Sequence, residues 1–302
     1  FLTNTAAVNF GSPSTRLGYG FQFYDNTEGE GRLNTRSGCV QLSYNLPGRF
    51  GRKFGNKMYG KKYIVSFGMQ GSIGQKSIDW SKFTFTDQLD PYEGLVLQNT
   101  ALVQGQESSN IIYDLSAGIR ARSEFGRRGS FVSLGAAMFH LNSPKESFFG
   151  FHTTLDPRYT GHFFIHFQTR KYMNNPSFLS IGYVFDRQQV LQTNTVYVAK
   201  DLTKNFTVGA AFRRKLVFNV DQNNDSFILQ FTFQTNSLIL GYSYYLTVSS
   251  LSVTSTFGSH EIGLIYTFRD SRLKKRQKPR NDKEECFFLN AKMKTEMKPY
   301  IF

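Results

Sequence analysis

The chain is poor in several residues and patterns that mark common protein classes. It holds two cysteines and one tryptophan among 302 residues. A secreted domain held together by disulfides carries more cysteines, so Cys39 and Cys286 are expected to be isolated thiols, with a bridge between them as the alternative. No stretch approaches about 20 consecutive apolar residues, which excludes a transmembrane helix.

Motifs that carry catalysis or bind cofactors are also missing. The sequence has no Cys-x-x-Cys pair, no His-Glu-x-x-His, no EF-hand loop, no Gly-x-Ser-x-Gly and no phosphate-binding glycine pattern. His162 and His166 have a spacing that suits a metal on a helix, but on a strand they would lie about 13 Å apart. We therefore expect no metal, no cofactor and no catalytic residue, although an enzyme with a Ser/His pair at one rim stays a third hypothesis.

The first residues of the given sequence are not expected to be a targeting segment. Phe1 follows neither a basic region nor an apolar region of the kind found in signal peptides. We expect that the numbering starts after processing or that the true start is missing.

The positive charge is concentrated at one end. Residues 269–302 hold eleven Lys or Arg and five Asp or Glu, a net +6 of the total +14. No recognition helix or RNA-binding aromatic motif accompanies this charge, so a nucleic-acid partner is not expected.

Strands with two unlike faces dominate what is present. From Ile262, large apolar residues recur at every second position through Leu264, Tyr266 and Phe268. The same period-two pattern recurs along the chain, and it predicts twelve strands, at about 15–25, 36–46, 61–78, 110–125, 129–140, 158–170, 177–187, 190–200, 205–215, 225–234, 236–246 and 259–268. Bulky residues on one side and polar or small ones on the other, about ten residues a strand, are typical of a membrane barrel.

The predicted connections differ between the two ends of these strands. One end has mostly long connections, including the acidic 79–109 and 141–157, and the other has mostly short ones, with the basic 47–60 as its exception. Outer-membrane barrels have long external loops and short periplasmic turns. The expected fold is an all-β, transmembrane antiparallel β-barrel of about 12 strands (12–14), and a soluble sandwich is the alternative because it explains the strands but not the asymmetry.

Several segments resemble one family. They are residues 77–91 (Ser-Ile-Asp-Trp-Ser-Lys-Phe-Thr-Phe-Thr-Asp-Gln-Leu-Asp-Pro), Asp114-Leu-Ser-Ala-Gly118, Gly135-Ala-Ala-Met-Phe-His-Leu-Asn-Ser-Pro144, Pro157-Arg-Tyr159, Val248-Ser-Ser-Leu-Ser252 and 259–268. In this order and spacing the chain resembles the PorP/SprF family of the type IX secretion and gliding machinery of Bacteroidetes. It departs from the family at Asn4-Thr5-Ala6, where Asn-Pro-Ala is usual, at Gln22-Phe-Tyr24, where Asn-Gln-Trp is often seen, and in the tail 269–302, which matches no part of it.

The resemblance implies a non-enzymatic protein of the bacterial outer membrane. Such proteins support secretion or cell-surface anchoring of large adhesins, especially cargo with a type B C-terminal domain, and they link to periplasmic ring or motor components. Three parts are expected, namely a periplasmic or plug segment at 1–14, a lipid-embedded barrel at 15–268 and a basic periplasmic tail at 269–302.

Two sets of residues are candidates for contacts with partners. The external set, for a secreted surface protein, is Asp79, Trp80, Phe83, Asp87, Asp90, Pro91, Glu93, His140, Asn142 and Pro144. The periplasmic set is Arg49, Arg52, Lys53, Lys274, Lys275 and Arg276. For the segment around Trp80 the other interpretation is an interfacial aromatic anchor with a self-packed loop. The alternative function is a passive diffusion channel for small or hydrophobic solutes.

Overall fold

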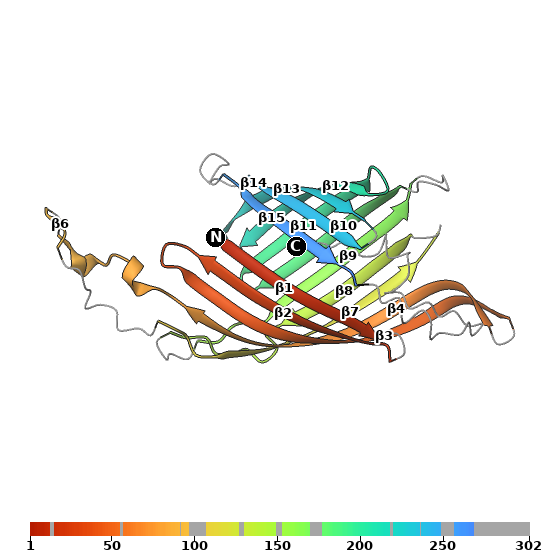
Figure 1. Ribbon diagram of the computed structural model, residues 1–302, viewed down its shortest axis with the longest axis horizontal. Coiled ribbons are helices and arrows are strands. Elements are labelled where there is room, and N and C mark those ends of the chain that lie inside the picture. Colours follow the sequence, from red (N-terminus) through yellow and green to blue (C-terminus); the bar gives the residue numbers. More distant parts are fainter. Residues whose placement is uncertain are drawn as a thin grey trace. The chain divides into compact units, whose positions relative to one another are not determined.

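A computed structural model of the chain describes residues 1–12, 15–54, 57–90, 92–96, 107–126, 130–148, 153–169, 177–217, 220–235, 237–248 and 257–268. The regular elements in these ranges are strands and two short 3₁₀ helices (Figure 1). They are β1 Leu2–Ser12, β2 Leu17–Glu28, β3 Leu33–Phe54, β4 Lys57–Ser77, η1 Trp80–Lys82, η2 Thr86–Gln88, β5 Leu89–Asp90, β6 Gly94–Leu95, β7 Ile112–Glu124, β8 Phe131–Phe139, β9 Arg158–Gln168, β10 Phe178–Gln188, β11 Leu191–Asp201, β12 Phe206–Val217, β13 Val220–Gln234, β14 Leu238–Thr247 and β15 Ser259–Tyr266.

Thirteen strands form one antiparallel sheet in the order of the sequence, and β5 with β6 form a small second sheet. This arrangement confirms an all-β antiparallel fold, and the single continuous sheet differs from the two packed sheets of a sandwich. β1 and β15 are its edges, and no pairing between them occurs within the described residues. Closure of the sheet into a barrel therefore stays a prediction.

All twelve predicted strands are present, and β1 is a thirteenth that the periodicity did not predict. β1 pairs with β2 over its whole length, from Leu2 opposite Thr27 to Ser12 opposite Leu17. This pairing does not test the periplasmic or plugging role predicted for residues 1–14, which stays a prediction.

The predicted connection at 47–60 is wrong in extent, because β3 and β4 continue through most of it. Pro47, Gly48 and Gly51 are residues common in turns, yet a strand accommodates them where its edge has no neighbour. At about 3.3 Å per residue, the 22 residues of β3 extend for roughly 70 Å.

The chain divides into two compact units. The first unit comprises Phe1–Asn45, Ser66–Gly118 and Ala137–Arg158. Across its strands β2, β3 and β4, the side-chain amide of Gln41 donates to the side-chain oxygens of Gln22 and Gln70, each at 3.1 Å. The same strands expose Phe21, Phe23, Val40 and Leu42 on the opposite face.

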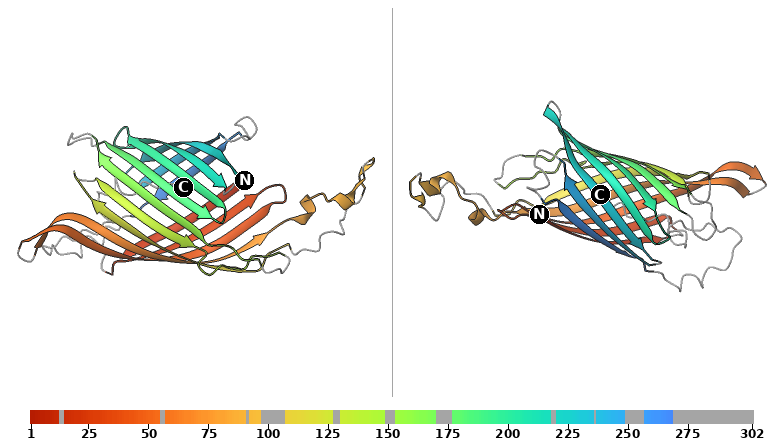
Figure 2. Two further views of the ribbon diagram at one scale, coloured as in Figure 1. Left: turned by 180° about the vertical axis from the view of Figure 1, so that it is seen from behind. Right: turned by 90° about the horizontal axis from the view of Figure 1, so that it is seen from above.

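The second unit comprises Leu46–Val65, Ile119–Ala136 and Tyr159–Phe302. Its strands β10 to β15 lie side by side in register (Figure 2). On β13, Gln230 and Thr232 are buried while Phe231 and Phe233 are exposed, as the alternation predicted. The buried face also holds a cluster of apolar side chains, consisting of Phe164, Tyr197, Ala199, Ala211 and Ile228.

Burial is thus inverted relative to a water-soluble protein. Ser180 and Ser243 are among the most deeply buried side chains, whereas Ile262 is 74% exposed and Leu264 is 66% exposed. Polar residues inside and apolar residues outside are favourable only where the outer face contacts hydrocarbon. Within the described residues, no helix is long and apolar enough to cross a membrane.

Candidate docking surface of the first unit

The connection from β4 to β7 begins as an anchored segment of the first unit. The backbone N–H of Asp79 donates to the carbonyl of Gly31 at 3.0 Å, which ties the segment to the turn between β2 and β3. The N–H of Ile78 donates to the carbonyl of Glu107 at 2.8 Å, and the N–H of Ser109 donates to the carbonyl of Lys76 at 2.7 Å. These bonds hold the two ends of the connection together.

Asp79 begins the short helix η1. Its carboxylate accepts hydrogen bonds from the Ser81 hydroxyl at 2.6 Å and from the Ser81 N–H at 3.1 Å. These bonds stabilise the ionised carboxylate, so they lower the pKa of Asp79 below its ordinary value, with the hydroxyl as the largest cause. This is the geometry of a helix N-cap, and here it begins a single turn of 3₁₀ helix after the end of β4.

Aromatic rings gather directly after this cap. The Trp80 ring lies 6.0 Å from Phe83 and 6.5 Å from Phe148, measured between centroids, and the contact with Phe148 is edge-on. Phe83 also packs against Phe85 at 6.3 Å. The Phe83 ring occupies the place where a Cβ on Gly31 would lie, so glycine is required there for this packing. The cluster therefore joins two loops and a turn of the first unit.

The connection then forms a small hairpin of β5 and β6. The Asp90 carboxylate accepts from the N–H groups of Tyr92 at 2.8 Å and Glu93 at 3.1 Å, and these bonds lower its pKa, Tyr92 first. Gly94 follows with a positive φ of 77°, a conformation that suits glycine. The hairpin places Tyr92 in solvent, with 97% of its surface exposed.

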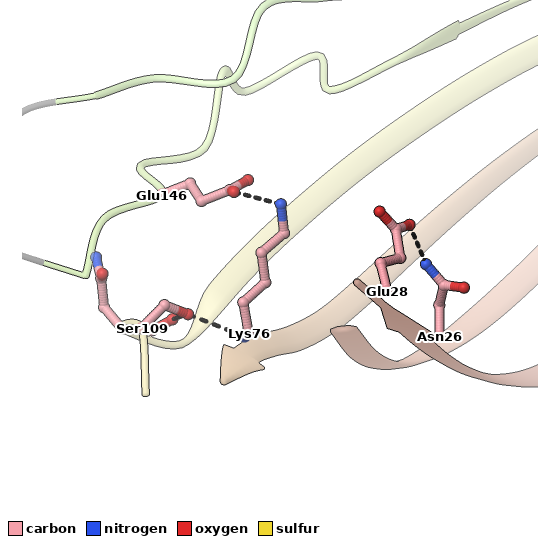
Figure 3. A network of polar contacts seen from close by, with 6 residues as sticks. Asn26, Glu28, Lys76, Ser109 and Glu146 are labelled. Atoms are coloured by element: carbon pink, nitrogen blue, oxygen red, sulfur yellow. Dashed lines mark hydrogen bonds and ion pairs between the residues drawn. The ribbon is translucent and has the colours of Figure 1, made fainter. Parts of the chain in front are cut away.

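The connection from β8 to β9 folds back on itself beside β4. Glu146 N–H donates to the Thr153 carbonyl and Leu155 N–H to the Pro144 carbonyl, both at 2.9 Å. Figure 3 shows Lys76 of β4 reaching Glu146 of this connection in an ion pair. The Ser109 hydroxyl accepts from the Lys76 N–H at 2.9 Å. One strand therefore organises both loops.

His140 and Asn142 face the sheet and brace β7. The Asn142 side chain donates to the Tyr113 carbonyl at 2.7 Å and accepts from the Leu115 N–H at 3.0 Å, so it continues the backbone ladder beyond β8. His140 Nδ1 lies 3.1 Å from the Asp114 carboxylate. These contacts join the segment around Asp114 to the segment around His140, and they support the loop that follows β8.

A Ser/His pair does occur in the second unit. His166 Nδ1 lies 2.8 Å from the Ser180 hydroxyl, but each residue is only 1% exposed. The imidazole is stacked against Phe178 at 4.7 Å and packs against Phe131 at 5.0 Å. A substrate cannot reach such a pair without opening the sheet, so the geometry is that of a packed structural contact. In the described part of the chain no cluster of three or more His, Cys, Asp or Glu could hold a metal.

The predicted contact residues fall into different situations. Asp79, Trp80, Phe83, Asp87, Asp90 and Glu93 lie on the β4–β7 connection, and His140, Asn142 and Pro144 lie on the β8–β9 connection. Arg49 is exposed on β3, and Arg52 and Lys53 also lie on that strand. Pro91, Lys274, Lys275 and Arg276 lie outside the described residues, as does Cys286. A role in docking stays a prediction for all of them.

The residues that assemble this surface were not predictable from the sequence. Lys76, Glu146 and Gly31 carried no periodic or motif signal, because their partners are distant in the chain. Phe148 was inside a predicted loop but was not singled out. Asp114 was part of a family segment. Its spacing to His140 was the one feature of the sequence that could have indicated their contact.

These observations define the class of protein. An antiparallel sheet with an apolar outer face, a polar inner face and ordered loops beyond the strand ends is that of an outer-membrane β-protein.

The chain belongs to the PorP/SprF family, described as Type IX secretion system membrane protein PorP/SprF, whose family model matches residues 2–266. It is thus an outer-membrane component of the type IX secretion system. No curated protein and no solved structure matches the chain.

Proposed function

We propose that this protein is a non-enzymatic barrel that holds a secreted adhesin, with a type B C-terminal domain, at the cell surface through the loops of the first unit. The observations that carry the proposal are the braced aromatic cluster of Trp80, Phe83 and Phe148 and the exposed Tyr92 further along the same connection. Aromatic anchors on a rigid support are what protein interfaces use most. The acidic side chains around them would orient a partner more than they would add affinity.

The proposed orientation follows from the connections. The long β4–β7 and β8–β9 connections lie at the same end of the up-and-down sheet, and barrels place long connections outside the cell. The β3–β4 end is then periplasmic. A membrane strand needs about 9–11 residues, so roughly half of β3 and β4 extends beyond the bilayer into the periplasm. This extension and the basic tail 269–302 are the proposed links to the periplasmic machinery.

The buried face of the second unit favours docking over the alternative of a diffusion channel. Phe164, Tyr197 and Ile228 are packed together there, with exposures of 6%, 4% and 2%. Side chains that fill the inner face of a small barrel leave little room for solutes. Single-channel recordings on the purified protein are expected to show no steady open current, and large open currents would support the channel instead.

The docking proposal is tested in cells with a matched pair of tyrosine variants. Tyr92→Ala removes an exposed ring from the β5–β6 hairpin, and Tyr113→Ala removes an exposed ring from β7, on the face assigned to lipid. Both proteins are expected to reach the outer membrane. Tyr92→Ala should reduce co-purification of the surface protein at least several-fold, and Tyr113→Ala should not. Equal recovery with both variants, and also after replacing residues 80–96 with a short linker, would show that these loops do not dock cargo.

A further inference from the structure

The extension of β3 and β4, here called the β3–β4 arm (Leu46–Val65), has a charge of one sign. It carries Arg49, Arg52, Lys53, Lys57, Lys61 and Lys62 and no acidic residue. Arg49 and Lys61 are exposed in the structure, on β3 and β4 respectively. The sequence around the arm is also free of acids, since none lies between Glu30 and Asp79. The sequence of the arm thus gives it a positive field.

One edge of the arm has no neighbouring strand within the described residues. The register of β2 with β3 ends at Leu17 opposite Tyr44, and the N–H of Asn45 then donates to the carbonyl of Arg16 at 2.9 Å. β3 continues to Phe54, which leaves residues 46–54 beyond the end of β2. An exposed strand edge is a template for an added strand.

The direction of the backbone groups on this edge follows from two contacts. The Asn45 N–H points toward the side of β2, and backbone groups on a strand alternate between its two sides. The Phe50 carbonyl points the other way, toward Gly60 of β4. Position 51 therefore directs its N–H to the open edge. Pro47 lies on the same side, where a missing N–H disturbs no pairing with β4.

We propose that the β3–β4 arm binds an acidic, extended protein segment, which adds to the open edge of β3 as a further strand. Backbone hydrogen bonds would supply affinity, and the basic side chains would select acidic partners. The chain's own tail 269–302 is a poor occupant, because its net charge of +6 has the same sign as that of the arm. The inference rests on the proposed function for placing the arm in the periplasm.

The test uses the full-length protein in nanodiscs of zwitterionic lipid and a fluorescent peptide of alternating Glu and Thr, about 10 residues long. Gly51→Pro removes the N–H at the open edge, and Gly51→Ala keeps it as the matched control. Arg49→Glu with Lys61→Glu reverses part of the charge. The peptide is expected to bind the wild type and Gly51→Ala equally, in a salt-sensitive manner. Gly51→Pro and the charge-reversed protein should each bind about tenfold more weakly or worse.

Three results would overturn the inference. Equally strong binding of a peptide of alternating Lys and Thr would show that the arm does not select acidic partners. Equal binding by Gly51→Pro and Gly51→Ala would show that the peptide does not add to β3 as a strand. Loss of peptide binding in nanodiscs that contain phosphatidylglycerol would show that anionic headgroups occupy the arm. Because this assay contains no cargo and no external loop contact, its failure is distinguishable from failure of the docking proposal.

Discussion

Lys76 and Glu146 form an ion pair although 70 positions separate them in the sequence. Lys76 lies on β4 and Glu146 on the β8–β9 connection, so the pair fixes the second loop to the strand from which the first loop departs. The side chains retain 26% and 21% of their exposure, which places the pair between a surface contact and a buried one.

A double-mutant cycle is expected to detect this pair. Lys76→Ala, Glu146→Ala and the double variant should give a coupling energy of about 1 kcal/mol, at the upper end of values for partly exposed pairs. The measurement is resistance of the β8–β9 connection to limited proteolysis, followed in the three variants. Arg36 with Asp25 provides a more exposed control pair, with Arg36 at 69% exposure, and a smaller coupling is expected for it. Strictly additive effects of Lys76→Ala and Glu146→Ala would show that the contact stabilises nothing.

Gly31→Ala is expected to displace the aromatic cluster. A methyl group at this position would collide with the Phe83 ring, so η1 can no longer rest against the β2–β3 turn. Trp80 is the single tryptophan of the chain and therefore reports on this region alone. Its emission should shift to longer wavelength as the ring becomes more hydrated. Gly38→Ala on β3 is the matched control, because no atom of the described residues lies within 4 Å of the added Cβ. An unchanged spectrum in Gly31→Ala would contradict the packing.

Replacing Asn142 is expected to loosen the junction of β7 with the second loop. Asn142→Ala leaves the Tyr113 carbonyl and the Leu115 N–H without this partner, which should cost about 0.5–1.5 kcal/mol because both contacts are exposed and water can replace the lost partner. Asn142→Asp should be at least as harmful, since it replaces the donor facing the Tyr113 carbonyl with an acceptor. Backbone amide exchange at Leu115 measures the effect, and Asn110→Ala on the neighbouring loop serves as control. Unaltered protection of Leu115 in both Asn142 variants would refute the bracing role.

Acid is expected to loosen the first loop. The pKa values of Asp79 and Asp90 are lowered in the folded protein, by bonds from Ser81 and from the Tyr92 and Glu93 N–H groups respectively. A lowered pKa means that the stabilisation is complete above the ordinary value of 3.8 and is lost as the pH falls through the folded value. Trp80 emission should therefore be constant from pH 7 to about 4 and change only below that range.

The control for the acid response is Asp79→Ala, which removes the titrating cap of η1. Its Trp80 emission should already be shifted at pH 7 and should change less on acidification. A wild-type transition centred well above pH 4 would mean that other groups control the loop.

The strands of this protein could be predicted from the sequence because side chains on a strand alternate between its two faces. Each face of the sheet has its own surroundings, so the residue types alternate as well. Phe231 and Phe233 alternate with Gln230 and Thr232, and the structure exposes and buries them accordingly. β1 was not predicted, because a strand with Asn4, Ala6 and Ala7 shows little difference in polarity between its two faces. The full length of β3 and β4 was not predicted. Pro47 and Gly51 are common in turns, but a strand with an open edge tolerates them.

The sequence predicted the loops of the docking surface but not the contacts that hold them in place. The sequence by itself determined the two-faced strands, the acidic loops at one end and the basic segments at 47–62 and 269–302, because composition and period are local properties. The tertiary structure alone decided that Phe83 rests on Gly31, that Lys76 holds Glu146 and that Asn142 extends the ladder of β7. Those contacts join residues distant in the chain, so they depend on the register of the strands, which no local pattern encodes.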